Sequence, residues 1–190
     1  MSELTLSTTN AGARAGNAIG AMILSFFGTA WLSGACLIAW PEESPVRTAG
    51  LALVVTTGAV LFFSALQRWR ANRGLPCAES SSAWWQRRAR QFHLINAGQW
   101  IAVLVAVNVL HNTGLDAWVL PALIAIVGVH FLLLAPVLLQ PRNYLIGVIL
   151  ILAASLCPWL GDGSLLAVPP AITGLTLWIA GSFPREGAAA

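Results

Sequence analysis

Six apolar stretches account for most of this 190-residue chain. The hydrocarbon core of a bilayer is about 30 Å thick and an α-helix rises about 1.5 Å per residue, so about 20 apolar residues cross it. The stretches cover approximately residues 16–40, 48–66, 92–110, 117–139, 144–160 and 164–183. Backbone polar groups find no water in hydrocarbon, and a helix pairs them internally. The sequence therefore predicts an all-α membrane protein: six transmembrane helices in three consecutive hairpins, forming one domain over residues 1–190.

The shortage of charge supports this fold class. Only 9% of the residues are charged and 57% are hydrophobic, whereas a soluble domain carries about a quarter charged residues. Most of the exterior must therefore face lipid. The net charge is +3, but all ten basic residues are arginines close to the ends of apolar stretches. This placement favours lipid phosphates over nucleic acid as their partners.

The arginines also predict an orientation. The segment between the second and third stretches, residues 67–91, holds six of them: Arg68, Arg70, Arg73, Arg87, Arg88 and Arg90. Two more follow the fourth and sixth stretches, at Arg142 and Arg185. The opposite ends carry four acidic residues and one arginine: Glu42, Glu43, Asp116, Asp162 and Arg47. By the positive-inside rule, residues 67–91 form a cytoplasmic basic loop and both termini are cytoplasmic.

Within this loop, a short segment before the third stretch combines aromatic and cationic side chains. The residues concerned are Trp84, Trp85, Arg87, Arg88 and Arg90. Tryptophan favours the headgroup region and arginine binds phosphate, so we expect this segment to lie flat on the inner leaflet against anionic phospholipid. A specific lipid site and simple anchoring of the topology are both compatible with the pattern, and anchoring is the commoner use.

The hairpins show a weak internal repeat. Gly58 follows Trp31 by 27 residues, and Gly128 follows Trp100 by 28 residues. A phenylalanine-containing run and an arginine-bearing end come after each glycine. Parallel repeats of this kind are common in transporter folds, although apolar helices also align by chance.

Polar side chains at membrane depth gather in the third and fourth stretches. The spacing of His93, Asn96 and Trp100 places them on one helix face, with Gln99 beside it. Three interpretations remain open: hydrogen-bonding contacts between helices, a small polar pocket, or a metal or haem site. No metal-binding spacing occurs, which disfavours the last. The pocket candidates are His130, Asn96, Gln99, Trp100, His93, Trp31 and Gly128.

Missing residue types disfavour several functions. No Asp or Glu falls inside an apolar stretch, whereas coupled transporters usually keep an intramembrane carboxylate. Lysine is absent, which excludes a retinal Schiff base. No nucleophile or phosphate-binding motif occurs, so an enzyme is disfavoured and we expect no cofactor or metal. The cysteines Cys36, Cys77 and Cys157 form no CxxC motif; a disulfide between Cys36 and Cys157 stays open, with simple packing favoured.

Three segments of the sequence form a recognisable pattern: residues 92–100 with Asn96, Gln99 and Trp100, residues 126–132 with Gly128 and His130, and residues 141–147. In this pattern, residues 90–150 resemble a group of small bacterial integral membrane proteins of unknown activity. The resemblance implies a six-helix fold in a bacterial inner membrane and supplies no activity.

Three functional hypotheses follow. The leading one is a small inner-membrane protein that binds or passes a small uncharged solute in a polar pocket between its helices. The first alternative is a structural or accessory subunit whose polar residues only pack helices. The second is a lipid sensor that acts through the Trp/Arg segment. Homo-oligomers or a membrane partner are compatible with all three.

Overall fold

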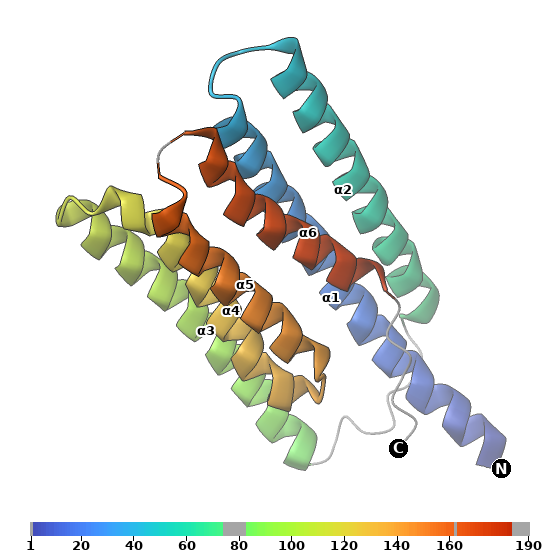
Figure 1. Ribbon diagram of the computed structural model, residues 1–190. Helices are drawn as coiled ribbons and strands as arrows, with labels where there is room; N and C mark the ends of the chain where they lie inside the picture. Colours follow the sequence, from blue (N-terminus) through green and yellow to red (C-terminus); the bar gives the residue numbers. More distant parts are fainter. Residues whose placement is uncertain (1, 74–82, 162, 184–190) are drawn as a thin grey trace.

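The computed structural model describes residues 2–73, 83–161 and 163–183, with side chains from residue 16 in the first range and from residue 86 in the second. This part of the chain forms six α-helices (Figure 1): α1 Ser2–Ala39, α2 Pro45–Asn72, α3 Ala83–Asn112, α4 Val119–Leu138, α5 Arg142–Leu156 and α6 Val168–Ser182. With the short 3₁₀ turns that flank α4, α5 and α6, each of the six is long and apolar enough to cross a membrane. The prediction of an all-α chain with six helices able to span a membrane is confirmed, whereas the three-hairpin topology and the internal repeat stay predictions.

Three helices extend clearly beyond their predicted apolar stretches. α1 begins at Ser2 rather than near residue 16. α2 continues to Asn72 rather than ending near residue 66, and α3 begins at Ala83 rather than near residue 92. Arginine, glutamine and alanine are good helix formers, so a helix need not stop where its apolar stretch ends. The segment expected to lie flat on the inner leaflet is therefore not a separate surface helix, because it forms the first turns of α3. The side chains of Trp84 and Trp85 lie outside the described residues, as do Cys77, Asp162 and Arg185.

Prolines lie at the end of α5 and at the start of α6. α5 stops at Leu156 and a 3₁₀ turn, Cys157–Trp159, follows with Pro158 inside it. Pro169 and Pro170 occupy the second and third positions of α6, within the first turn, where their missing N–H groups are not needed by the helix.

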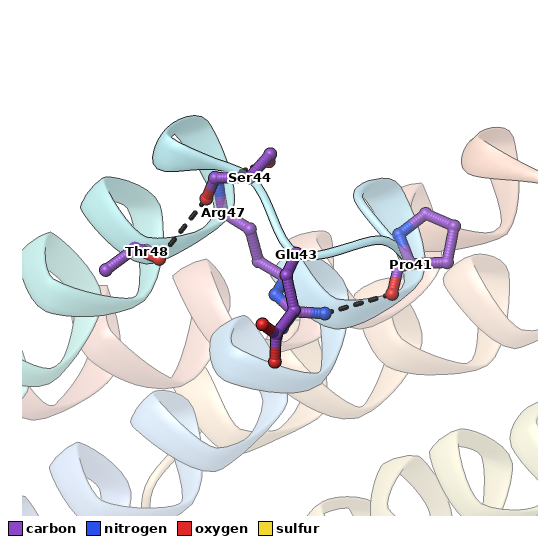
Figure 2. A network of polar contacts seen from close by, with 5 residues as sticks. All are labelled: Pro41, Glu43, Ser44, Arg47 and Thr48. Atoms are coloured by element: carbon purple, nitrogen blue, oxygen red, sulfur yellow. Dashed lines mark hydrogen bonds and ion pairs between the residues drawn. The ribbon is translucent and has the colours of Figure 1, made fainter.

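The connection between α1 and α2 shows how a helix start is built (Figure 2). The Ser44 side chain accepts a hydrogen bond from the backbone N–H of Arg47 at 3.1 Å, and Pro45 begins the helix. The Arg47 guanidinium donates to the Pro41 carbonyl oxygen at 2.9 Å and lies 3.4 Å from a Glu43 carboxylate oxygen. This capping set satisfies donors that α2 itself cannot pair.

The helices pack in the order α2, α1, α6, α5, α4, α3 (Figure 1). α1 contacts α2 on one side and α6 on another, α5 joins α6 to α4, and α3 packs mainly against α4. The main cluster of buried apolar side chains comes from α1, α4, α5 and α6. The molecule is thus a four-helix core flanked by α2 and α3.

Reciprocal glycine contacts hold two of these helix pairs together. A Cβ on Gly174 of α6 would lie 2.8 Å from the Gly28 oxygen of α1, and one on Gly28 would lie 3.0 Å from the Gly174 oxygen. Gly128 of α4 and Gly147 of α5 face each other in the same way, with corresponding distances of 3.0 and 2.7 Å. Small residues let helix backbones approach closely in lipid.

Most of the described arginines lie at one end of the bundle, and Arg47 lies at the other. The end of α2, the start of α3 and the turn between α4 and α5 all lie at this end in Figure 1. The connections containing Glu42, Glu43 and Asp116 lie at the other end. The helix arrangement therefore separates basic from acidic ends, as the sequence predicted.

Candidate functional site

One face of α3 carries both amides that the sequence singled out. Asn96 and Gln99 are half-buried, and so are three later apolar residues of α3, at intervals of three and four: Val103, Ala106 and Leu110. This is the spacing of a single helix face. Since α3 packs mainly against α4, the face containing Asn96 and Gln99 is the one directed into the protein.

His130 of α4 lies at this contact and is only 9% exposed. Its ring lies against the backbone of Ile95 in α3 and edge-on to Phe131, with ring centroids 5.8 Å apart. The Nδ1 atom is buried without a partner among the described residues. In one tautomer Nδ1 is an unpaired acceptor and in the other it is an unpaired donor, so the atom lacks a hydrogen bond in both. An unpaired buried polar atom costs about 1–3 kcal/mol.

Asn96 contributes an acceptor. Its Nδ2 donates to the Phe92 carbonyl oxygen at 2.7 Å, which satisfies one amide hydrogen within its own helix. The bond uses the nitrogen of the amide and leaves its oxygen available. Gln99 lies on the next turn of the same face. The α3–α4 contact therefore combines an unpaired ring nitrogen and an amide oxygen with a second amide that can both donate and accept.

Aromatic side chains extend the site towards α1. The Trp100 ring lies 6.4 Å from the ring of Phe27, measured between centroids, so α3 reaches α1 here. Trp31, one turn after Phe27, packs against the core cluster. The two predicted wall residues are thus not shown in mutual contact: Trp100 meets Phe27, and Trp31 belongs to the core. We call His130, Asn96, Gln99, Trp100 and Phe27 the polar cluster.

Two predicted pocket residues lie elsewhere. Gly128 faces α5, where a Cβ would lie 2.8 Å from the Ile151 side chain, so it serves the α4–α5 contact. Two residues along a helix rotate a side chain by about 200°, which directs His130 away from that contact. His93 is exposed and lies against Phe92, with ring centroids 5.8 Å apart. Neither residue belongs to the polar cluster.

A hydrogen-bonded junction at α1, α2 and α6 was not found by sequence analysis. Trp178 Nε1 donates to the Thr29 hydroxyl at 3.2 Å and lies 3.3 Å from the Ser25 carbonyl oxygen. Thr29 in turn donates to Ser25 at 2.7 Å, and its side chain fills the space beside Gly58. The signal available in the sequence was Ser25 and Thr29 one turn apart on an apolar helix. Its polar groups are paired with one another, which makes it a packing element.

The described cysteines and the other unpaired polar atoms lie outside the polar cluster. Cys36 and Cys157 are both free: Cys36 lies beside Gly50 of α2, and Cys157 belongs to the core cluster. Within the described ranges, no group of three or more His, Cys, Asp or Glu side chains could hold a metal ion. At the α4–α5 turn, three buried polar atoms lack partners, one each from Gln140, Arg142 and Asn143.

Comparison of the chain with protein-family models, with curated proteins and with solved structures finds no match in any of the three. The similarity of residues 90–150 to small bacterial membrane proteins therefore stays a prediction, and functional inference rests on the polar cluster.

Proposed function

We propose that this multi-pass membrane protein binds or passes a small uncharged solute at the polar cluster. The observation that supports the proposal is the buried, unpaired Nδ1 of His130 on α4, the helix against which the face of α3 with Asn96 and Gln99 is packed. A buried polar atom without a hydrogen bond is unfavourable at membrane depth. A solute with an O–H group, which both donates and accepts, supplies the missing partner.

The absence of acidic residues from the apolar stretches supports an uncharged ligand. A charged solute in hydrocarbon would need an opposite charge or a metal beside it. The polar cluster instead offers a neutral imidazole, two amides and two aromatic faces. These groups hydrogen-bond and stack on a neutral polar molecule without a net electrostatic requirement.

The setting we propose is a bacterial inner membrane with the arginine-rich end in the cytoplasm. Separation of basic and acidic ends along the bundle supports this orientation. Six consecutive spans would then place both termini in the cytoplasm.

Accessibility of His130 to a small neutral reagent tests the pocket. His93 and His111 are exposed, so replacing both with Gln leaves His130 as the single histidine of the chain. Diethyl pyrocarbonate is then added to the folded protein in liposomes, and carbethoxylation is read by mass spectrometry. We expect modification of His130 in the folded state, with His130→Gln as the control that stays unmodified. Modification only after denaturation would show a closed contact and remove the proposal.

A structural or accessory role is the second candidate. It is favoured by the Asn96 bond to Phe92, because that amide is partly satisfied without any ligand. In this role His130→Ala and Asn96→Ala lower the free energy of unfolding, and the histidine reagent never reaches His130 in the folded state.

The arginine-bearing start of α3 suggests anionic phospholipid as a further partner. Arg87 and Arg90 are exposed there, where α3 emerges from its apolar stretch, and arginine binds lipid phosphate. Replacing both with Gln should reduce the preference of the reconstituted protein for anionic over zwitterionic vesicles. An unchanged preference, or one insensitive to salt, would contradict this partnership.

A further inference from the structure

The outward side of α3 carries a regular seam of exposed residues. Its seven members alternate at intervals of three and four along almost the whole helix: Gln91, Leu94, Gly98, Ile101, Val105, Asn108 and Asn112. We call them the outer seam. This spacing is the one by which one helix packs along another. The half-buried residues that face α4 lie on other positions of the same helix, so the outer seam is left without a neighbour in the described chain.

The burial of α3 does not match its polarity. None of the residues in its most apolar window is buried, against 39% in α5 and 44% in α6. Yet the mean hydropathy of α3 is close to that of α5 and α6, and well below that of α2 and α4. α2 is also little buried, at 11%, but it is strongly apolar, as a lipid-facing helix should be. α3 is therefore as polar as an interior helix and as exposed as a lipid-facing one.

Two members of the outer seam contribute to this polarity, in addition to Asn96 and Gln99 on the inward face. Asn108 is exposed within the span, and its Nδ2 donates only to the Leu104 carbonyl oxygen of its own helix, at 3.0 Å. Gly98 has no atom within 4 Å of where a Cβ would lie, whereas Gly28, Gly128 and Gly174 each meet a neighbouring helix. An exposed amide is unfavourable in hydrocarbon, and Gly98 has no packing role within one chain.

We propose that the outer seam is the interface of a homodimer, in which α3 of one copy packs against α3 of a second copy. Copies in one membrane share an orientation, so a two-fold axis along the membrane normal brings the seam against itself in parallel. Gly98 lies where the two helices approach most closely. Asn108 meets its own counterpart, and this pairing is complementary because an amide both donates and accepts. The polar cluster lies on the other side of α3, so this interface is separate from the proposed solute site.

Disulfide trapping in the membrane tests the interface. All three native cysteines are changed to alanine, and a single cysteine is introduced at Ile101 of the seam, 61% exposed, or at Leu53 of α2, 70% exposed. We expect oxidation to give a covalent dimer with Ile101→Cys and several-fold less with Leu53→Cys. Adding Gly98→Leu should abolish the Ile101→Cys cross-link. It should leave the fold intact, because a Cβ at this position has no atom of the described chain within 4 Å and the position faces outward.

Native mass spectrometry from lipid nanodiscs provides the second measurement. The expected mass is that of two copies, falling to one copy with Gly98→Leu and shifting towards one copy with Asn108→Val. A single copy for the unaltered protein, with or without bound lipid, would overturn the proposal. So would equal cross-linking at both cysteine positions, or a different protein retained in place of the second copy. The histidine reagent assay is independent of all these outcomes.

Discussion

Replacing Gly28 with alanine should destabilise the protein, although alanine is the better helix former. The added Cβ would overlap the Trp178 ring and lie 3.0 Å from the Gly174 oxygen. The ring cannot turn away freely, because its Nε1 is bonded to Thr29. α1 and α6 must therefore separate, or that hydrogen bond must break.

The magnitude follows from three contributions. Overpacking a close contact costs about 1–3 kcal/mol, and loss of the Trp178 hydrogen bond adds about 0.5–1.5 kcal/mol. The gain in helix propensity from glycine to alanine, about 1 kcal/mol, opposes them. We expect a net loss of about 0.5–3.5 kcal/mol in the free energy of unfolding.

Gly34 provides the matched control on the same helix, because nothing lies within 4 Å of its Cβ position. Gly34→Ala gains the same propensity without a steric penalty, so its stability should be unchanged or slightly higher. Unfolding is measured by titration with sodium dodecyl sulfate in mixed micelles, followed by tryptophan fluorescence. Equal stabilities for the two variants would show that α1 and α6 do not approach closely at Gly28, and would refute the packing argument.

Three further predictions address other parts of the molecule. Trp178→Phe removes the donor to Thr29 and should lower stability by about 0.5–1.5 kcal/mol in the same titration, whereas Trp159→Phe, at an 84% exposed position, should have little effect. Ser44→Ala removes the cap of α2 and should lower stability by about 0.5–2 kcal/mol. The control is Ser155→Ala, because the Ser155 hydroxyl bonds only within its own helix. Equal losses in the two variants would show that the cap does not stabilise α2. With the arginine-rich end in the cytoplasm, a membrane-impermeant maleimide should label Cys77 in inside-out vesicles but not in intact cells, and the reverse pattern would invert the proposed orientation.

Helix number, and the helix ends next to prolines, could be predicted because they depend on local sequence. Hydrocarbon thickness fixes how many apolar residues a span needs, and Pro158 and Pro169 act on the backbone immediately around them. The expected flat segment failed for a related reason. Hydropathy marks where a helix leaves lipid, but helix propensity decides where it ends, and residues 83–91 favour continuing the helix.

Packing order could not be predicted, because apolar residues surround most of these helices. In water, an apolar face reveals which side of a helix is buried; in lipid, apolar side chains suit both the interior and the exterior. Gly28, Gly128 and Gly174 were visible in the sequence, yet nothing there indicated that Gly28 meets Gly174 while Gly128 meets Gly147. The direction of Asn96 and Gln99 into the protein was predictable, because polar groups do distinguish the two sides.

The same reasoning gives α3 two different polar faces. Asn96 and Gln99 are directed towards α4, whereas Gly98 and Asn108 are directed away from every described neighbour. A helix with one polar face can be explained by one contact, but a second polar face on the opposite side needs a second contact. If a solute occupies the first and another copy of the chain occupies the second, α3 connects the two sites as a single rigid element. Solute binding at His130 should then change the dimer equilibrium only if it shifts α3. Gly98→Leu, which is expected to be monomeric, tests separately whether the solute site works in a single copy.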